Sequence, residues 1–199
     1  EFYAGDGTPR FNPFFIPKMI VDIAAGVISI RNKLYGPNYC TISACASSNT
    51  AIISAFDTIR LNKAKVMIAG GSEAAITPAS VGGFSAAQAL SKRNDSPTTA
   101  SRPFDKERDG FVMAEGAGAL ILEELEHALK RGATIHAELV GGGMAADAYH
   151  LTGTSPDGIG AAQGMIKALR EAGISMSEID YINAHATSTP IGDNSELIG

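Results

Sequence analysis

The chain has 199 residues, 45% of them hydrophobic and 19% charged, a composition typical of a soluble globular protein with one large domain or two small ones. The formal net charge is −5, and no run rich in Lys and Arg occurs, which argues against a nucleic-acid partner. No apolar stretch reaches the roughly 18 residues that a membrane helix needs, because Lys18 and Asp22 interrupt the most apolar segment. The acidic opening of the chain does not resemble a signal peptide.

The first third of the chain is predicted to contain a loop, a helix and a buried strand. Residues 5–17 are rich in Gly, Pro and aromatic side chains, which is typical of a loop that covers an apolar surface or one that packs on itself. Apolar residues recur at helical spacing over residues 16–31, and residues 39–44 alternate like a strand.

Cys45 follows that strand and precedes a helix in which Ala51, Ala55 and Ile59 recur at helical spacing. The N-terminus of a helix has unpaired N–H groups and a positive dipole end, which favour a thiolate. Cys45 is therefore a candidate nucleophile, although a free cysteine between alanines is as often a small core residue. Cys40 is too close along an extended chain to pair with it easily, and free thiols indicate a reducing compartment.

The middle of the chain predicts a second strand and a charged loop. Residues 65–69 form a short apolar run that ends in Gly70-Gly71, so the order strand, helix, strand predicts a parallel sheet. Phe84 is the one large apolar residue in the Ala- and Gly-rich segment 77–90. The loop over residues 91–110 is expected to be held by a network of ion pairs rather than to act in catalysis; its charged members are Arg102, Asp105, Lys106, Arg108 and Asp109.

The last third begins a new series of elements. Strands are expected over residues 117–123, 135–140 and 181–184, with helices over residues 125–131 and after residues 155–157 that end at Gly132 and Gly173. A boundary between two half-domains is placed near Gly132. The other histidines of the chain (His127, His136 and His150) stand in no metal-ligand pattern, so no metal site is expected.

The strand over residues 181–184 leads into the segment His185-Ala186-Thr187-Ser188-Thr189-Pro190, which has the same build as the Cys45 stretch. Together with the segments 70–74, 82–84, 89–91 and 101–111, these two stretches resemble the β-ketoacyl-acyl-carrier-protein synthases, most closely the type II elongating condensing enzymes. The resemblance implies an α/β thiolase-like fold with α-β-α-β-α layers, of which residues 1–132 are the end of one half and residues 133–199 the start of the other. Since members of the family continue well past Gly199, the chain is expected to be an internal fragment.

By this resemblance the reaction is a decarboxylating condensation in fatty acid elongation. Cys45 would carry the acyl chain as a thioester, and His185 would be the first of two histidines that stabilise the negative charge formed from a malonyl thioester. The second histidine and an ordering lysine would lie beyond Gly199, so the isolated fragment is expected to be inactive.

The resemblance also assigns supporting roles. Phe84 would line the acyl pocket, and Phe15 would reach the acyl pocket of a partner subunit. The residues matched to pantetheine contacts are Thr152, Thr187 and Thr189. Glu196 matches the acid that pairs with the missing lysine, with Asp193 beside it. The alternatives are loop capping for the threonines and a dipole-favoured helix start for the acids. Ala186 stands where the family usually has Gly.

The implied partner is an acidic acyl carrier protein, whose phosphopantetheine carries the substrate, so the enzyme itself would bind no cofactor. Candidate docking charges are Arg10, Lys92 and Arg93, while Gln88 replaces a docking arginine of the type II enzymes. A homodimer in the cytoplasm, or in an organelle matrix or stroma, is expected.

Other classes fit the sequence less well. A papain-like hydrolase would need an Asn or Asp that orients the histidine, and no hydrolase signature surrounds Cys45. A silent chain-length-factor-like subunit typically lacks the cysteine, and a polyketide-type ketosynthase remains an alternative within the same family. Initiating synthases pair His with Asn, and thiolases use a different second cysteine.

Overall fold

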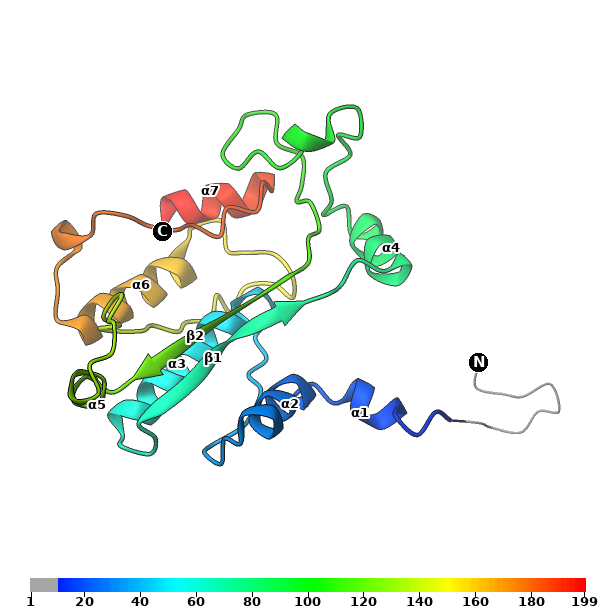
Figure 1. Cartoon of the computed structure of the whole chain (residues 1–199). Coiled ribbons are helices and arrows are strands. Elements are labelled where there is room, and N and C mark those ends of the chain that lie inside the picture. Colours follow the sequence, from blue (N-terminus) through cyan, green and yellow to red (C-terminus); the bar gives the residue numbers. More distant parts are fainter. Residues whose placement is uncertain (1–10) are drawn as a thin grey trace.

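A computed structural model describes residues 11–199 (Figure 1). Its helices are α1 (Phe15–Met19), α2 (Ile23–Asn32), α3 (Ser47–Arg60), α4 (Pro78–Ala86), α5 (Leu125–Lys130), α6 (Ile159–Ala172) and α7 (Pro190–Ile198), and its strands are β1 (Val66–Glu73) and β2 (Gly116–Glu123). Short 3₁₀ turns occur at Ala44–Ala46, Pro97–Thr99 and Met176–Glu178. Within residues 11–199, no helix is long and apolar enough to cross a membrane.

The helices follow the predicted periodicity with one difference. α3, α5 and α6 lie where helices are expected, and Gly132 and Gly173 follow the last two with φ of 66° and 70°, the left-handed conformation that ends a helix. The helix predicted over residues 16–31 is instead two helices, α1 and α2, because Ile20 adopts extended backbone with ψ of 121°.

The sheet differs from the prediction. β1 and β2 are the strands predicted at residues 65–69 and 117–123, but they pair antiparallel, with Val66 opposite Glu123 and Glu73 opposite Gly116. The chain leaves the end of β1, passes through α4 and the charged loop, and returns at that same end, so β2 runs in the opposite direction (Figure 1). The predicted parallel pairing of residues 39–44 with residues 65–69 is not formed within the described residues, because residues 39–44 join no ladder and β1 pairs antiparallel with β2.

Residues 39–44, 135–140 and 181–184 were predicted to be strands on their apolar alternation, and within the described part of the chain none of them joins a ladder. A strand is defined by its hydrogen-bonded neighbours, so alternation without a neighbouring strand leaves only an extended segment.

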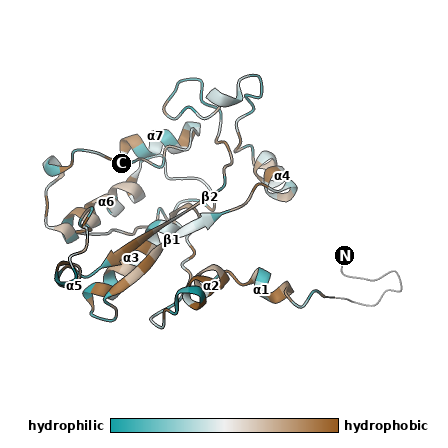
Figure 2. Cartoon of the chain, viewed as in Figure 1, coloured by the Kyte–Doolittle hydropathy of each residue, from teal (hydrophilic) through white to brown (hydrophobic). Residues whose placement is uncertain are grey.

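α3 is the centre of a layered arrangement. It packs against β1 and β2, and Figure 2 shows hydrophobic colouring on α3 and on part of each strand. Residues 141–143 lie on another side of α3: a Cβ added to Gly142 would be 2.7 Å from the Ile53 side chain, whereas one added to Gly141 would be 2.6 Å from the Ala168 carbonyl oxygen in α6. Successive residues of an extended chain face opposite ways. The order is therefore sheet, α3, extended segment and α6, which is part of an α-β-α-β-α stack.

Glu171 of α6 joins these layers. Its carboxylate accepts a hydrogen bond of 2.8 Å from the Gly142 N–H and forms an ion pair with Arg60 of α3. The Gly142 N–H, and after it the Arg60 guanidinium, lower the pKa of Glu171 below its usual value. One side chain thus connects α3, the extended segment and α6.

Candidate active site

Cys45 lies in the tight turn Ala44–Ala46 immediately before α3, as predicted from the sequence. Ala44 has φ of 45°, which an L-residue adopts rarely. The turn is held by hydroxyl groups: Thr41 Oγ1 donates to the Ser47 carbonyl (2.9 Å), while Ser47 Oγ accepts from the Ser43 N–H (2.8 Å) and donates to the Ala44 carbonyl (2.7 Å). Cys45 is exposed and carries a free thiol. The arrangement presents a thiol at the start of a 14-residue helix.

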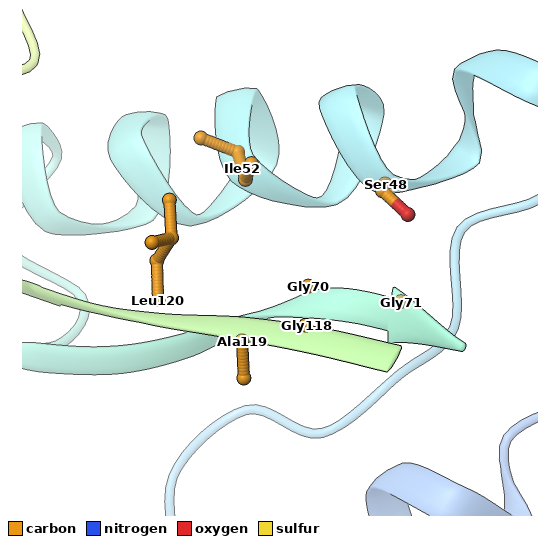
Figure 3. Close-up of a pocket in the computed structure, with 7 residues that line it drawn as sticks. All are labelled: Ser48, Ile52, Gly70, Gly71, Gly118, Ala119 and Leu120. Atoms are coloured by element: carbon orange, nitrogen blue, oxygen red, sulfur yellow. The ribbon is translucent and has the colours of Figure 1, made fainter. Parts of the chain in front are cut away.

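The first turns of α3 are held against the sheet across glycines. Figure 3 shows Ser48 and Ile52 facing the strands over a shallow hollow, whose lining residues are Ser48, Ile52, Gly70, Gly71, Gly118, Ala119 and Leu120. A Cβ added to Gly71 would overlap the Ser48 hydroxyl. Gly71 therefore allows the helix that begins beside Cys45 to approach the strands closely.

His185 lies in the loop of residues 185–189 that leads into α7. The Glu196 carboxylate of α7 accepts hydrogen bonds from the backbone N–H groups of His185 (2.5 Å) and Ala186 (2.8 Å). Ala186 has φ of 46°, so the position where the resembled family has Gly is one that requires the left-handed conformation. The hydroxyls of Thr187 and Thr189 are 3.0 Å apart and point the same way, as predicted.

The charged loop over residues 91–110 contains part of the predicted ion-pair network. Arg102 pairs with Asp105 (3.7 Å) and with Asp109 (3.2 Å). The Ser91 hydroxyl, the Lys92 N–H and the Arg102 guanidinium lower the pKa of Asp109 below its usual value. This carboxylate is therefore kept ionised and fixes the base of the loop.

Arg108 finds its partner outside that loop, which the sequence did not predict. Its Nε lies 3.0 Å from Oδ2 of Asp193, and Asp193 is completely buried. Asp193 is in the first turn of α7, as a helix-start acid would be, but its carboxylate is used in this long-range pair. A buried acid needs such a partner, although nothing in the local pattern identifies which cation supplies it.

The aromatic candidates occupy separate elements. Phe84 of α4 meets Phe111 edge-on, with ring centroids 5.1 Å apart, and remains 44% exposed. Phe15 begins α1, with its ring 5.7 Å from that of Phe11. Their roles in acyl pockets remain predictions.

The remaining candidates lie in loops. Thr152 is exposed, and its N–H donates to Nδ1 of His150 at 3.2 Å. Lys92 is exposed, whereas Arg93 is half-buried, and its Nε has no hydrogen-bond partner within residues 11–199. Arg10 lies outside the described residues.

The structure thus brings one group of predicted residues together: His185, Thr187, Thr189, Asp193 and Glu196 share the loop and α7. Cys45 lies on a different element, at the start of α3, and no hydrogen bond joins it to His185 in the described part of the chain. Within residues 11–199, no group of three or more His, Cys, Asp or Glu side chains could hold a metal ion.

Comparison with known proteins identifies the class. Residues 2–128 match the family described as Beta-ketoacyl synthase, N-terminal domain, and residues 136–199 match Beta-ketoacyl synthase, C-terminal domain. The chain belongs to the beta-ketoacyl synthase family. Its expected thiolase-like fold class is confirmed, since the chain superposes with a TM-score of 0.92 and 38% identity on a ketosynthase solved as "type II PKS acyl-carrier protein in complex with its ketosynthase bound to the hexaketide", covering 98% of this chain and 48% of that one.

Two curated relatives are more similar in sequence. The chain is 54% identical over 190 residues to "3-oxoacyl-[acyl-carrier-protein] synthase 2" of Synechocystis sp., which covers 96% of this chain and 46% of the relative. It is 52% identical over 191 residues to "3-oxoacyl-[acyl-carrier-protein] synthase I, chloroplastic" of Arabidopsis thaliana, covering 96% of this chain and 40% of that protein. The chain spans less than half the length of these relatives.

Proposed function

We propose that a full-length synthase containing this chain catalyses the decarboxylating condensation of an acyl thioester with malonyl-acyl carrier protein in fatty acid elongation. The observation that carries this proposal is the turn of Cys45, where hydroxyl groups hold an exposed thiol at the N-terminus of α3. A thiolate accepts an acyl group readily and releases it readily, which both steps of the reaction need. The names of the curated relatives support the same reaction.

In this proposal the two loops divide the chemistry. Cys45 forms the acyl thioester, and His185 donates a hydrogen bond to the thioester oxygen as malonyl loses carbon dioxide and negative charge develops there. Thr152, Thr187 and Thr189 bind the pantetheine arm. Phe84 and the partner's copy of Phe15 line the acyl pocket.

The remaining features of the proposal concern assembly. The boundary between the two halves lies near Gly132, between the two family matches, and the synthase is a homodimer of the cytoplasm or of an organelle matrix or stroma. Its partner is an acyl carrier protein, with Arg10, Lys92 and Arg93 as docking charges. The 199-residue chain alone is inactive because further catalytic groups lie outside it.

The test is acylation of a full-length synthase that contains this chain, followed by mass spectrometry of its peptides. Incubation with an acyl carrier thioester is expected to place the acyl group on Cys45. Cys40 is the internal control, since it is also exposed and free. An adduct on Cys40 with Cys45 unmodified would contradict the assignment.

A second measurement concerns His185. The His185→Ala variant is expected to lose malonyl decarboxylation while Cys45 can still be acylated. Normal decarboxylation by this variant would show that another group supplies the hydrogen bond.

The second candidate function is that of a polyketide-type ketosynthase, which the similarity to a ketosynthase bound to a hexaketide favours. The product distinguishes the two when malonyl carrier protein is the only substrate. A polyketide-type ketosynthase would extend an unreduced poly-β-keto chain. A fatty acid enzyme would stop after one condensation until the keto group is reduced. A silent chain-length-factor-like subunit would neither acylate Cys45 nor decarboxylate malonyl groups.

A further inference from the structure

Residues 102–110 and residues 188–194 form a set of contacts that we call the brace. Ser188 lies at its centre and is completely buried. Its N–H donates to Asp193 Oδ1 (3.0 Å), its carbonyl accepts from the Gly110 N–H (3.0 Å), and its hydroxyl accepts from the Arg102 N–H (3.0 Å). All three polar groups of this residue are therefore bonded, which fixes its backbone at φ of 68°.

Arg108 contributes the side-chain part of the brace. Its Nε donates to the Thr189 carbonyl (3.1 Å) and lies 3.0 Å from Asp193, and its Nη2 donates to the Pro190 carbonyl (2.7 Å) and to Oδ1 of Asn194 (2.9 Å). Only 11% of the side chain is exposed. The planar guanidinium has donors pointing in several fixed directions, which the single ammonium of lysine cannot reproduce.

We infer that Arg108 is a positioning residue for the pantetheine-binding threonines of the proposed reaction. It binds the carbonyl of Thr189 itself, and the Thr189 hydroxyl is 3.0 Å from that of Thr187. His185 is held separately, through the bonds from its N–H and that of Ala186 to Glu196. The loop thus has two anchors: Arg108 fixes its threonine end and Glu196 fixes its histidine end.

The inference rests on the proposed function and makes a separable kinetic prediction. The Arg108→Lys variant keeps the charge beside Asp193 but loses donors to the two carbonyls. It is expected to raise the KM for malonyl carrier protein and for a short malonyl-pantetheine substrate alike. The expected rise is about tenfold, the factor that corresponds to the free energy of one charge-assisted hydrogen bond. The kcat and the rate at which iodoacetamide alkylates Cys45 are expected to change less than twofold.

Arg131→Lys is the matched control. Arg131 also pairs through a forked guanidinium, with Glu123, but its side chain is 57% exposed and it lies in the segment after α5. This variant is expected to keep the KM of the wild type. A double variant, Arg108→Gln with Asp193→Asn, removes both buried charges together and serves if Arg108→Lys does not fold, with the same rise in KM expected.

Hydrogen exchange gives a readout that does not depend on turnover. Amides of residues 186–194 are expected to exchange faster in Arg108→Lys, while those of α3 remain unchanged. If the wild-type synthase turns over malonyl carrier protein and Arg108→Lys has the same KM, the inference is overturned while the proposed function stands. A rise in KM accompanied by equally large decreases in kcat and in the rate of Cys45 alkylation would also overturn it, since these changes together indicate general destabilisation. A wild-type synthase that does not turn over malonyl carrier protein would overturn the proposed function, and the inference with it.

Discussion

The close approach of residues 141–143 to α6 makes Gly141 the position where one added methyl group has the clearest effect. In Gly141→Ala the new Cβ would lie 2.6 Å from the Ala168 carbonyl oxygen, 2.8 Å from the Ala172 N and 3.2 Å from its Cβ. Two of these atoms are backbone atoms of a helix, so a rotamer change cannot relieve the overlap. Ordinary contact requires α6 to move outward by a sizeable fraction of an ångström.

The expected cost follows from overpacking. Forcing extra methyl groups into a packed contact typically costs about 1–3 kcal/mol. Moving α6 also lengthens the bond from the Gly142 N–H to Glu171, and a bond to a charged group contributes about 1.5–3 kcal/mol. We therefore expect the free energy of unfolding to fall by about 2–4 kcal/mol.

The assay is urea unfolding of a full-length synthase containing this chain, followed by circular dichroism. Gly116→Ala is the matched control, because a Cβ added there meets nothing within 4 Å. A titration of Glu171 gives a second readout: its pKa is expected to rise toward the usual value in Gly141→Ala, since the Gly142 N–H is the main cause of its lowering. Equal unfolding midpoints for the two variants would refute the layer order of sheet, α3, extended segment and α6.

Three further predictions concern single positions. Ala186→Val is expected to cost about 2 kcal/mol or more, whereas Ala186→Gly should stay within about 1 kcal/mol of wild type, because the backbone there is left-handed; urea unfolding measures both, and equal costs would contradict the conformation. Lys92→Glu is expected to raise the KM for carrier-bound substrate but not the KM for a pantetheine substrate, and the effect should fade above about 0.15 M salt. Lys63→Glu is the control, and a rise in KM for both substrates would argue against docking at Lys92. Glu123 has its pKa lowered to about 2 by Arg131 and His127, so its stabilising effect is present above about pH 4.5 and is lost as pH falls toward 2; a carboxyl NMR titration should find the pKa raised in Arg131→Gln, and an unchanged value would exclude the ion pair.

Local features of the molecule were predictable because neighbours along the chain determine them. The spacing of Ala51, Ala55 and Ile59 predicts α3, the left-handed Gly173 ends α6, and the turn at Cys45 follows from its place before a helix. The hydroxyls of Thr187 and Thr189 lie together as predicted, but strand alternation is not the reason, because Ser188 between them has left-handed and not extended backbone.

Features that depend on distant segments were not predictable in this way. The predicted parallel pairing of residues 39–44 with β1 depends on hydrogen bonds between distant segments, and apolar alternation alone does not reveal that residues 39–44 stay outside the ladder of β1 and β2. The ion-pair partner of Arg108 lies in α7, far along the chain, whereas the local charge pattern favoured a neighbour in the 91–110 loop. The left-handed backbone of Ser188 is imposed by its three buried hydrogen bonds. A serine at this position, where glycine would be usual, gives no sign of that conformation in the sequence.

The brace also has a consequence for synthesis of the protein on the ribosome. Thr189, whose carbonyl Arg108 binds, is 81 residues further along the chain. At elongation rates of about 5–20 residues per second, roughly 4–16 s pass between the synthesis of Arg108 and the synthesis of Thr189. During that interval the guanidinium of Arg108 has only the partners of its own loop and remains hydrated. Nascent chains that end before α7 are therefore expected to be cleaved by protease within residues 102–110, and the cleavage should cease once α7 has left the exit tunnel.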